Sequence, residues 1–147
     1  MKKVIHTDKA PKAIGPYSQA IEVNGLAALT GSIPMFETNG MLFISGQIPV
    51  DPATGKVAET IEEQTEQVLK NIGAILEEAG YTYADVVKTT CQLSDMANFK
   101  PMNEVYAKYF NENPPARAAF AVKALPMGVM VEIESIAVKS KGKLTLK

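Results

Sequence analysis

One long amphipathic segment, residues 60–80, constrains the fold of this chain more than any other feature of its sequence. Thr60 and Glu63 have the spacing of a capping box, which satisfies free backbone N–H groups at the start of a helix. Gly80 supplies the left-handed residue that commonly ends a helix. Between them, apolar residues recur every three or four positions, at Ile61, Val68, Leu69, Ile72, Ile75, Leu76 and Ala79. We predict a helix with one apolar face that packs on the core of a domain.

Short apolar runs on both sides of this helix predict strands. The expected strands are Val4–His6, Ala20–Val23, Leu42–Gly46, Val86–Leu93, Ala116–Lys123 and Met130–Lys139. A second helix is expected across Phe99–Phe110, where Pro101 lies in the first turn and costs no hydrogen bond. The order strands, helix, strand, helix, strands favours an α+β domain with a mixed sheet and both helices on one face. Alternation within Val86–Leu93 directs Val87, Cys91 and Leu93 to one side, so we expect Cys91 to be a small core residue.

The last expected strand has apolar residues on both of its faces. Ile133 and Ile136 fall on opposite sides of a strand because successive side chains alternate. Two helices cover only one face of such a sheet, so the other apolar face needs a partner. We therefore predict a homo-oligomer with sites where subunits meet.

Composition limits the classes of function. The 147 residues suit one domain, residues 1–147, and the formal net charge of −1 provides no basic surface for nucleic acid or a membrane. One cysteine and one histidine leave no Cys- or His-based metal site. The start, MKKVIHTDKAP, lacks an apolar signal segment, and no run is long enough to cross a membrane. We expect a cytoplasmic protein with no metal.

A segment of the chain is repeated at a spacing of 15 residues: the run from Glu22 to Met35 matches the run from Glu37 to Val50. The N-G pair, a Gly after Thr or Ser, and the I-P pair recur in register. One extra copy is too short for a solenoid, so we interpret it as a duplicated strand with its N-G turn, inserted at about residues 25–39. Either it adds a hairpin, or one copy displaces the other.

Arg117 carries the strongest functional signal. It stands alone in a strand-like run of Ala, Phe and Val, where an isolated guanidinium costs desolvation free energy unless an anion meets it. A structural ion pair and a socket for a small carboxylate both meet this need, and the ion pair is the commoner arrangement. Glu132, if its strand lay beside that of Arg117, would orient a water next to a carboxylate gripped by the guanidinium.

Two further motifs suggest a ligand site. Gly15-Pro16 forms a turn signal before Tyr17, which either presents its ring and hydroxyl to a ligand or is buried with the hydroxyl bonded. In the run Ile44–Pro49, Gly46 lies inside a strand, where glycine lets another backbone or a ligand approach closely or, more commonly, marks a bulge or a bend.

Together these segments closely resemble the reactive intermediate deaminase family, the RidA or YjgF-like proteins. The resemblance runs from about Val4 to Lys139 and is carried by APxAIGPYSQA, SGQIPVDPxTG, VVKTTCQLSDM and PAR…LP…VEIE. It implies hydrolysis of 2-imino acids, formed from the enamines 2-aminoacrylate and 2-aminocrotonate, to 2-keto acids and ammonia without a cofactor. It also implies a chorismate-mutase-like fold and a homotrimer with a sheet-lined core and three clefts between subunits.

The resemblance assigns roles to individual residues. It implies that Arg117 binds the substrate carboxylate, Glu132 activates water and Tyr17 lines the pocket. The family's S-G-Q strand falls on Ser45, Gly46 and Gln47. Many members carry a cysteine two residues after the arginine; that pocket position is Ala119 here, so we expect no thiol-dependent ligand chemistry.

Two questions stay open in the sequence. The first copy of the repeat has Thr30-Gly31-Ser32 where the second has Ser45-Gly46-Gln47, and we favour the second because it runs directly into Asp51-Pro52. The other question is whether the cleft is catalytic. A non-catalytic, carboxylate-binding trimer with a regulatory or chaperone-like role would need the arginine but no water-positioning glutamate, so Glu132 discriminates between the two functions.

Overall fold

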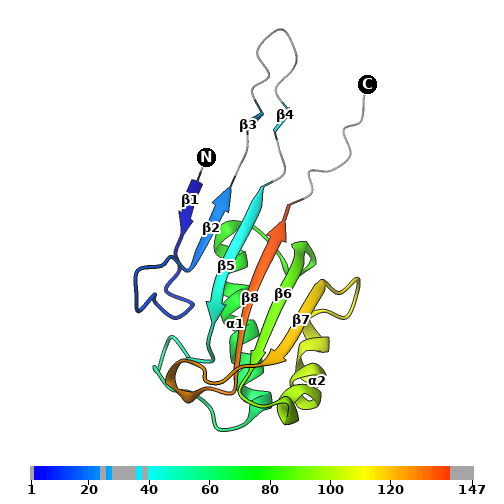
Figure 1. The fold of residues 1–147 in the computed structure, drawn as a ribbon. Helices are drawn as coiled ribbons and strands as arrows, with labels where there is room; N and C mark the ends of the chain where they lie inside the picture. The colour runs from blue at the N-terminus through cyan, green and yellow to red at the C-terminus, as the bar shows by residue number, and fades with distance from the viewer. Residues whose placement is uncertain (1, 24–25, 28–35, 38–39, 140–147) are drawn as a thin grey trace.

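A mixed sheet of six strands with two helices on one face forms the domain (Figure 1). The computed structural model describes residues 2–23, 26–27, 36–37 and 40–139. The sheet order is β1-β2-β5-β8-β6-β7, and β6 and β7 are the parallel pair. The strands are β1 (Lys2–Ile5), β2 (Ala20–Val23), β5 (Met41–Gln47), β6 (Val86–Leu93), β7 (Ala116–Ala121) and β8 (Val131–Val138), and the helices are α1 (Ile61–Ala79) and α2 (Phe99–Tyr109). The predicted α+β class with both helices on one face is confirmed.

Helix α1 begins and ends where its sequence signals predict. The Thr60 hydroxyl accepts a hydrogen bond from the Glu63 backbone N–H at 3.2 Å, and Gly80 ends the helix with a φ of 77°. The apolar stripe is buried against β5 and β8, with Val68, Leu69, Ile72 and Ile75 fully enclosed. Burial of this stripe is the main apolar contribution of the helix to the core.

Strand β6 shows how the two faces of the sheet differ. On the helix side, Thr89, Cys91 and Leu93 have no exposed surface. On the other side, Lys88, Thr90 and Gln92 are only partly covered. Burial raises the pKa of the Cys91 thiol to about 11, so Cys91 is the inert core residue that we predicted.

The expectation that Val87 shares the core face with Cys91 is wrong. Val87 is 45% exposed, whereas Val86 is buried. The pairing of β6 with β8 shifts register between Val86 and Lys88, and such an irregularity reverses which residues face the core.

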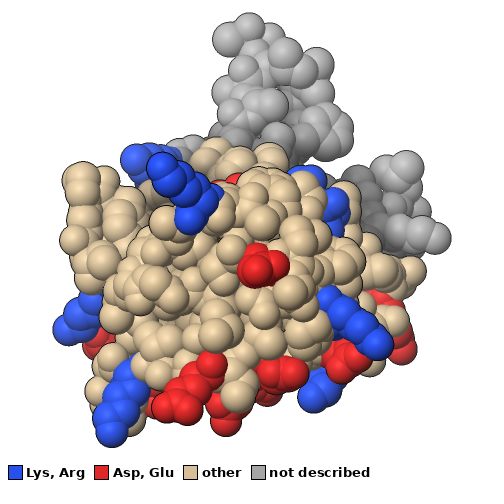
Figure 2. Space-filling view, turned by 60° about the horizontal axis from the view of Figure 1, so that its bottom comes forward, with Lys and Arg blue, Asp and Glu red and all other residues tan. Residues whose placement is uncertain are grey.

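The second face of the sheet has no helix over it. Ile133 is buried under the helices, while Ile136 lies on the open face close to Phe43, which is 42% exposed. Figure 2, which brings the lower end of Figure 1 forward, shows a broad area whose only charge is one small acidic group near its middle. The sheet therefore presents apolar side chains on both faces, as its last strand predicted.

Part of the duplicated segment forms a separate strand pair. Strand β3 (Leu26–Ala27) pairs antiparallel with β4 (Phe36–Glu37), beyond the ends of β2 and β5 (Figure 1). The place between β2 and β8 in the main sheet is taken by β5, from the second copy of the repeat. Thr30-Gly31-Ser32 lies outside the described residues.

Candidate functional site

A hollow of about 390 Å³ lies on the open face of the sheet, where β5 and β8 run side by side. We call it the glutamate hollow. Its lining includes Tyr17, Ser45, Gly46 and Glu132 from the predicted site, together with Ile14, Ile48, Pro126 and Glu134. Three segments distant in sequence therefore converge on one concave surface.

Gly46 allows the Glu132 side chain to lie directly against β5. A Cβ atom at Gly46 would overlap a carboxylate oxygen of Glu132 and would lie 3.0 Å from its Cδ. The pairing of β5 with β8 also shifts register between Ile44 and Gln47. The irregularity expected for a glycine inside this strand is present at this position, and the group that lies close to Gly46 is a side chain, that of Glu132.

The surroundings of Glu132 make its carboxylate a stronger base than an exposed glutamate. Burial, and secondly the neighbouring Glu134 carboxylate, raise the pKa of Glu132 above its ordinary value. Glu132 lies opposite Gln92 on β6, and Glu134 lies opposite Thr90. A carboxylate with a pKa nearer to neutrality accepts a proton from water more readily while still being ionised.

Tyr17 forms a wall of the hollow and is not buried. Its side chain is 49% exposed, and its hydroxyl accepts a hydrogen bond from the Ile14 N–H at 3.3 Å. Ser45 fastens the end of this loop to the sheet, because its hydroxyl donates to the Ser18 carbonyl at 2.6 Å. The structure therefore places the Tyr17 ring where a ligand in the hollow would touch it.

Gln19 holds the loop that carries Tyr17, a function that our sequence analysis missed. The buried Gln19 amide accepts a hydrogen bond from the Thr7 N–H at 2.7 Å. The same amide donates to the carbonyls of Thr7, Ala10 and Pro11. The position of Gln19 directly before an apolar strand was the available sequence signal for this role. An amide that is buried at such a position normally has hydrogen-bond partners for all its polar atoms.

Arg117 lies elsewhere, on the edge strand β7, and faces helix α2. Its Nη1 donates to Asn103 Oδ1 at 2.7 Å, and its guanidinium carbon lies 4.7 Å from the centre of the Tyr106 ring. In the described part of the chain, no carboxylate lies within 4.0 Å of the guanidinium. For these residues, the prediction that Arg117 forms a structural ion pair is wrong. The amide and the aromatic ring orient Arg117 without neutralising its charge.

Asn103 is a second residue that sequence analysis missed. Phe99, Asn103 and Tyr106 recur at spacings of four and three on α2, so they share one face of the helix. That face meets Arg117, because Phe99 also lies under the guanidinium at 5.6 Å. The sequence signal for this role was a single amide, Asn103, on a helix face that otherwise carries aromatic residues.

Arg117 and Glu132 do not meet within one chain. Strand β6 lies between β7 and β8, so the two strands are not adjacent. Arg117 is paired in register with Thr89 and faces the helices, whereas Glu132 lies in the glutamate hollow on the opposite face. The parallel crossover through α2 puts β7 outside β6, and the strand order in space could not be read from spacing in sequence.

The remaining predicted residues do not line the glutamate hollow. Ala119 is on β7 next to Cys91 in register and packs against the helix-side core. Gln47 is buried, and its amide donates to the Ser45 carbonyl at 3.1 Å. Within the described ranges, no group of three or more His, Cys, Asp or Glu side chains is placed to hold a metal ion. The described helices include none that is long and apolar enough to traverse a lipid bilayer.

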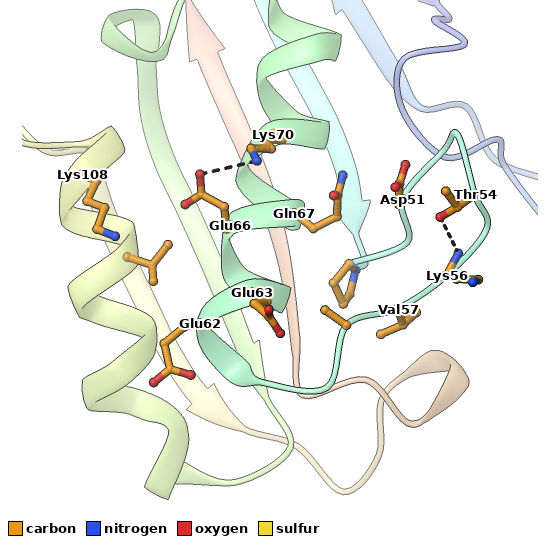
Figure 3. Close-up of a pocket in the computed structure, with 13 residues that line it drawn as sticks. Asp51, Thr54, Lys56, Val57, Glu62, Glu63, Glu66, Gln67, Lys70 and Lys108 are labelled. Carbon is orange, nitrogen blue, oxygen red and sulfur yellow. Dashed lines mark hydrogen bonds and ion pairs between the residues drawn. The ribbon is translucent and has the colours of Figure 1, made fainter.

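A larger cavity of about 670 Å³ lies between α1, α2 and residues 49–58 (Figure 3). It contains none of the predicted site residues. Its lining carries both signs of charge, and Lys70 forms an ion pair with Glu66 at 3.8 Å across one turn of α1. We prefer the glutamate hollow as the functional site because it combines a partly buried carboxylate with a shifted pKa and an exposed aromatic wall.

Comparison with known proteins gives consistent matches. The family model described as Endoribonuclease L-PSP matches residues 35–139. The chain is 50% identical over 137 residues to Reactive Intermediate Deaminase A, chloroplastic, from Arabidopsis thaliana, covering 92% of this chain and 65% of that protein. It is 44% identical over 140 residues to the 2-iminobutanoate/2-iminopropanoate deaminase of Homo sapiens, covering 95% and 91%. The solved structure of E. coli TdcF with bound serine matches with a TM-score of 0.79 at 38% identity, covering 95% of this chain and 99% of that one.

Proposed function

This chain belongs to the endoribonuclease L-PSP family, which includes reactive intermediate deaminases, and from this membership we propose that it hydrolyses 2-imino acids to 2-keto acids and ammonia. The observation that carries the proposal is the Glu132 carboxylate, seated over Gly46 in a hollow with an aromatic wall. The substrates we expect are the imines that arise from 2-aminoacrylate and 2-aminocrotonate. Both are small, and both carry one carboxylate beside the reacting carbon.

The chemistry needs a base and a fixed orientation. Glu132 takes a proton from water, and the oxygen adds to the imine carbon, which is already electrophilic when its nitrogen is protonated. The resulting tetrahedral adduct regains a proton on nitrogen and releases ammonia, leaving the keto group. No redox step occurs, and the protein's own side chains supply the acid and base, so we propose that no cofactor takes part.

Arg117 supplies the grip on the carboxylate in this proposal, but from a neighbouring subunit. Within one chain it faces away from the glutamate hollow, and among the described residues it has an amide partner and no acidic one. We propose a homotrimer that covers the open, apolar faces of the sheets and in which the edge strand β7 of one copy places Arg117 beside Glu132 of the next. A bidentate grip there would fix the imine carbon beside the attacking water.

A second function is supported by the same separation of Arg117 and Glu132. If subunits do not bring them together, Arg117 with Asn103 and Tyr106 forms a socket that binds a carboxylate without turning it over. The chain would then be a regulatory or chaperone-like carboxylate-binding trimer. The expected cytoplasmic location and the absence of a nucleic-acid partner stay predictions under either function.

The test is a coupled assay with freshly made imine. An amino acid oxidase or a dehydratase generates the 2-imino acid in solution, and the release of 2-keto acid is followed with and without the purified protein. We expect the protein to accelerate release well beyond spontaneous hydrolysis. Tight keto-acid binding with no acceleration would favour the non-catalytic socket instead.

A further inference from the structure

A second cavity, of about 270 Å³, adjoins the glutamate hollow. The two share Ile14, Tyr17, Gly46 and Ile48 as lining, so they meet at these residues. The second cavity extends from the loop before β2 to the turn at Asp51–Gly55, and Met127 borders it. We call it the side-chain pocket.

Apolar residues predominate in the lining of the side-chain pocket. Ala10, Pro11, Val50 and Pro52 line it in addition to the shared residues. The lining also includes charged residues: the largely exposed Lys12 and Asp8 side chains lie 3.9 Å apart, and Asp51 Oδ1 accepts from the Ala53 N–H at 2.8 Å. The buried amides of Gln19 and Gln47 are bonded to backbone carbonyls. Such a lining favours an uncharged, apolar group over water.

Met127 holds an unusual backbone conformation at the border of this pocket. Its φ is 56°, a region that side-chain-bearing residues rarely occupy, and it is followed by Gly128 with a φ of 66°. The Met127 side chain is nevertheless 65% exposed, so packing inside this chain does not explain its position. A strained residue that presents an apolar side chain at a cavity is typical of a ligand-binding border.

We propose that the side-chain pocket binds the side chain of the 2-imino acid, and that this chain prefers imines with apolar side chains of three or four carbons over the methyl-bearing imine. This inference rests on the proposed function. With the imine carbon beside Glu132 and the carboxylate directed to a neighbouring guanidinium, the third substituent needs space that continues from the glutamate hollow. The side-chain pocket provides this space, and Tyr17 lines both the hollow and the pocket.

The size of the pocket agrees with such a side chain. A water molecule occupies about 30 Å³ in the liquid and a methylene is of similar size, so four carbons need about 120 Å³ and the 270 Å³ of the pocket leaves ample space for a leucine-type side chain. The side chain takes no part in bond making: water adds, ammonia leaves, and the group in the pocket is unchanged. Its burial stabilises the bound substrate and transition state by an amount that grows with each methylene.

The experiment compares 2-imino acids made by an L-amino acid oxidase from alanine, norvaline and leucine. We expect kcat/KM of the wild-type protein to rise about fourfold for each methylene buried. Val50→Phe fills the pocket and should lower the leucine-to-alanine ratio of kcat/KM at least tenfold. Met127→Asn keeps a residue that tolerates positive φ but replaces the thioether by an amide, and should lower the ratio severalfold. Met96→Asn, at an exposed methionine outside both cavities, is the matched control and should leave the ratio unchanged.

A second readout separates this inference from the proposed function. Binding of the corresponding 2-keto acids is measured by calorimetry on the wild-type protein and on Met127→Asn. Tighter binding of the longer keto acid, weakened in the variant, supports the pocket even if no imine is hydrolysed. A leucine-to-alanine ratio that neither variant changes, or keto acids that bind without regard to length, would overturn the pocket while leaving hydrolysis intact.

Discussion

At the scale of single residues, the hollow depends on the absence of a side chain at Gly46. The carboxylate of Glu132 occupies the space that a Cβ atom would need. The sequence showed that glycine stands inside a strand there, but not which group approaches it. That knowledge required the pairing of β5 with β8, which is set by the strand order of the whole sheet.

Gly46→Ala should inactivate the hollow without unfolding the domain. The methyl group displaces the Glu132 carboxylate, and a displacement of about 1 Å at a catalytic group costs on the order of a hundredfold in rate. The measurement is kcat/KM in the coupled assay together with the melting temperature. A fully active Gly46→Ala protein would show that the position of Glu132 over β5 is unimportant.

Glu132→Gln should abolish most turnover and at the same time stabilise the fold. The amide cannot accept a proton from water, which costs about 10²- to 10⁴-fold in rate, while affinity for a non-reactive keto acid persists. Because the folded-state pKa is raised, the ionised carboxylate is less favourable in the folded than in the unfolded chain at neutral pH. Removing the charge should therefore raise the melting temperature.

Glu134→Gln is the matched control, since Glu134 lies two residues further along the same face of β8. It should keep most of the turnover. In the wild-type protein, kcat/KM should fall as the pH drops through the raised pKa of Glu132, and Glu134→Gln should shift that fall to lower pH, because one of the two causes of the raised pKa is gone. An unshifted profile would mean that another group governs the pH dependence.

Arg117→Ala should lose imine hydrolysis while the chain stays folded. Loss of a bidentate, charge-assisted grip costs roughly 2–4 kcal/mol of binding or transition-state stabilisation. Lysine should rescue poorly, because its point charge cannot reproduce the fork or the stacking of a planar guanidinium on the Tyr106 ring, 4.7 Å away. Undiminished activity of Arg117→Ala would end the assignment of this arginine to the substrate carboxylate.

At the scale of elements, the parts of the fold with local signals were predictable and those set by long-range pairing were not. The cap at Thr60 and the stop at Gly80 determine α1 through contacts a few residues apart. The break in the alternation of buried and exposed side chains at Val87 arises from an irregular pairing with β8, some 50 residues away in sequence. It leaves no pattern in the local sequence. The same limit applies to Arg117, because the strand next to β7 and the register that pairs Arg117 with Thr89 are both set by long-range pairing with β6.

Deleting residues 25–39 should leave a protein that folds, assembles and hydrolyses imines at least as well. Val23 pairs with Met41, so the deletion joins β2 to β5 through the two residues Asn24 and Gly40. Asn-Gly is the preferred sequence of a two-residue hairpin turn between antiparallel strands. Circular dichroism, sedimentation and the coupled assay check the three expectations. A shortened chain that cannot fold would show that the extra copy has become structural.

At the scale of the whole molecule, the open sheet face and the positions of Arg117 and Glu132 lead to one experiment. Arg117→Ala and Glu132→Gln proteins are unfolded together, mixed in equal amounts and refolded. If each site takes its arginine from one copy and its glutamate from the next, random assembly of trimers restores both groups in roughly a quarter of all sites. Activity should recover to about that level.

The control for this mixing is each variant refolded alone, which should stay inactive. No recovery in the mixture, or sedimentation as a monomer at micromolar concentration, would contradict the shared cleft. Recovery without trimers would point to another symmetric assembly with the same shared site.

The opposite orientation of Arg117 and Glu132 in one chain also affects how the protein behaves on dilution. An enzyme with a complete site in each chain has the same specific activity at every concentration. Here, under the shared-site proposal, a lone chain holds both halves of the machinery and can use neither. Specific activity should therefore fall steeply and reversibly once the protein is diluted below the dissociation constant of the oligomer. The specific activity then reports the fraction of the protein that is assembled.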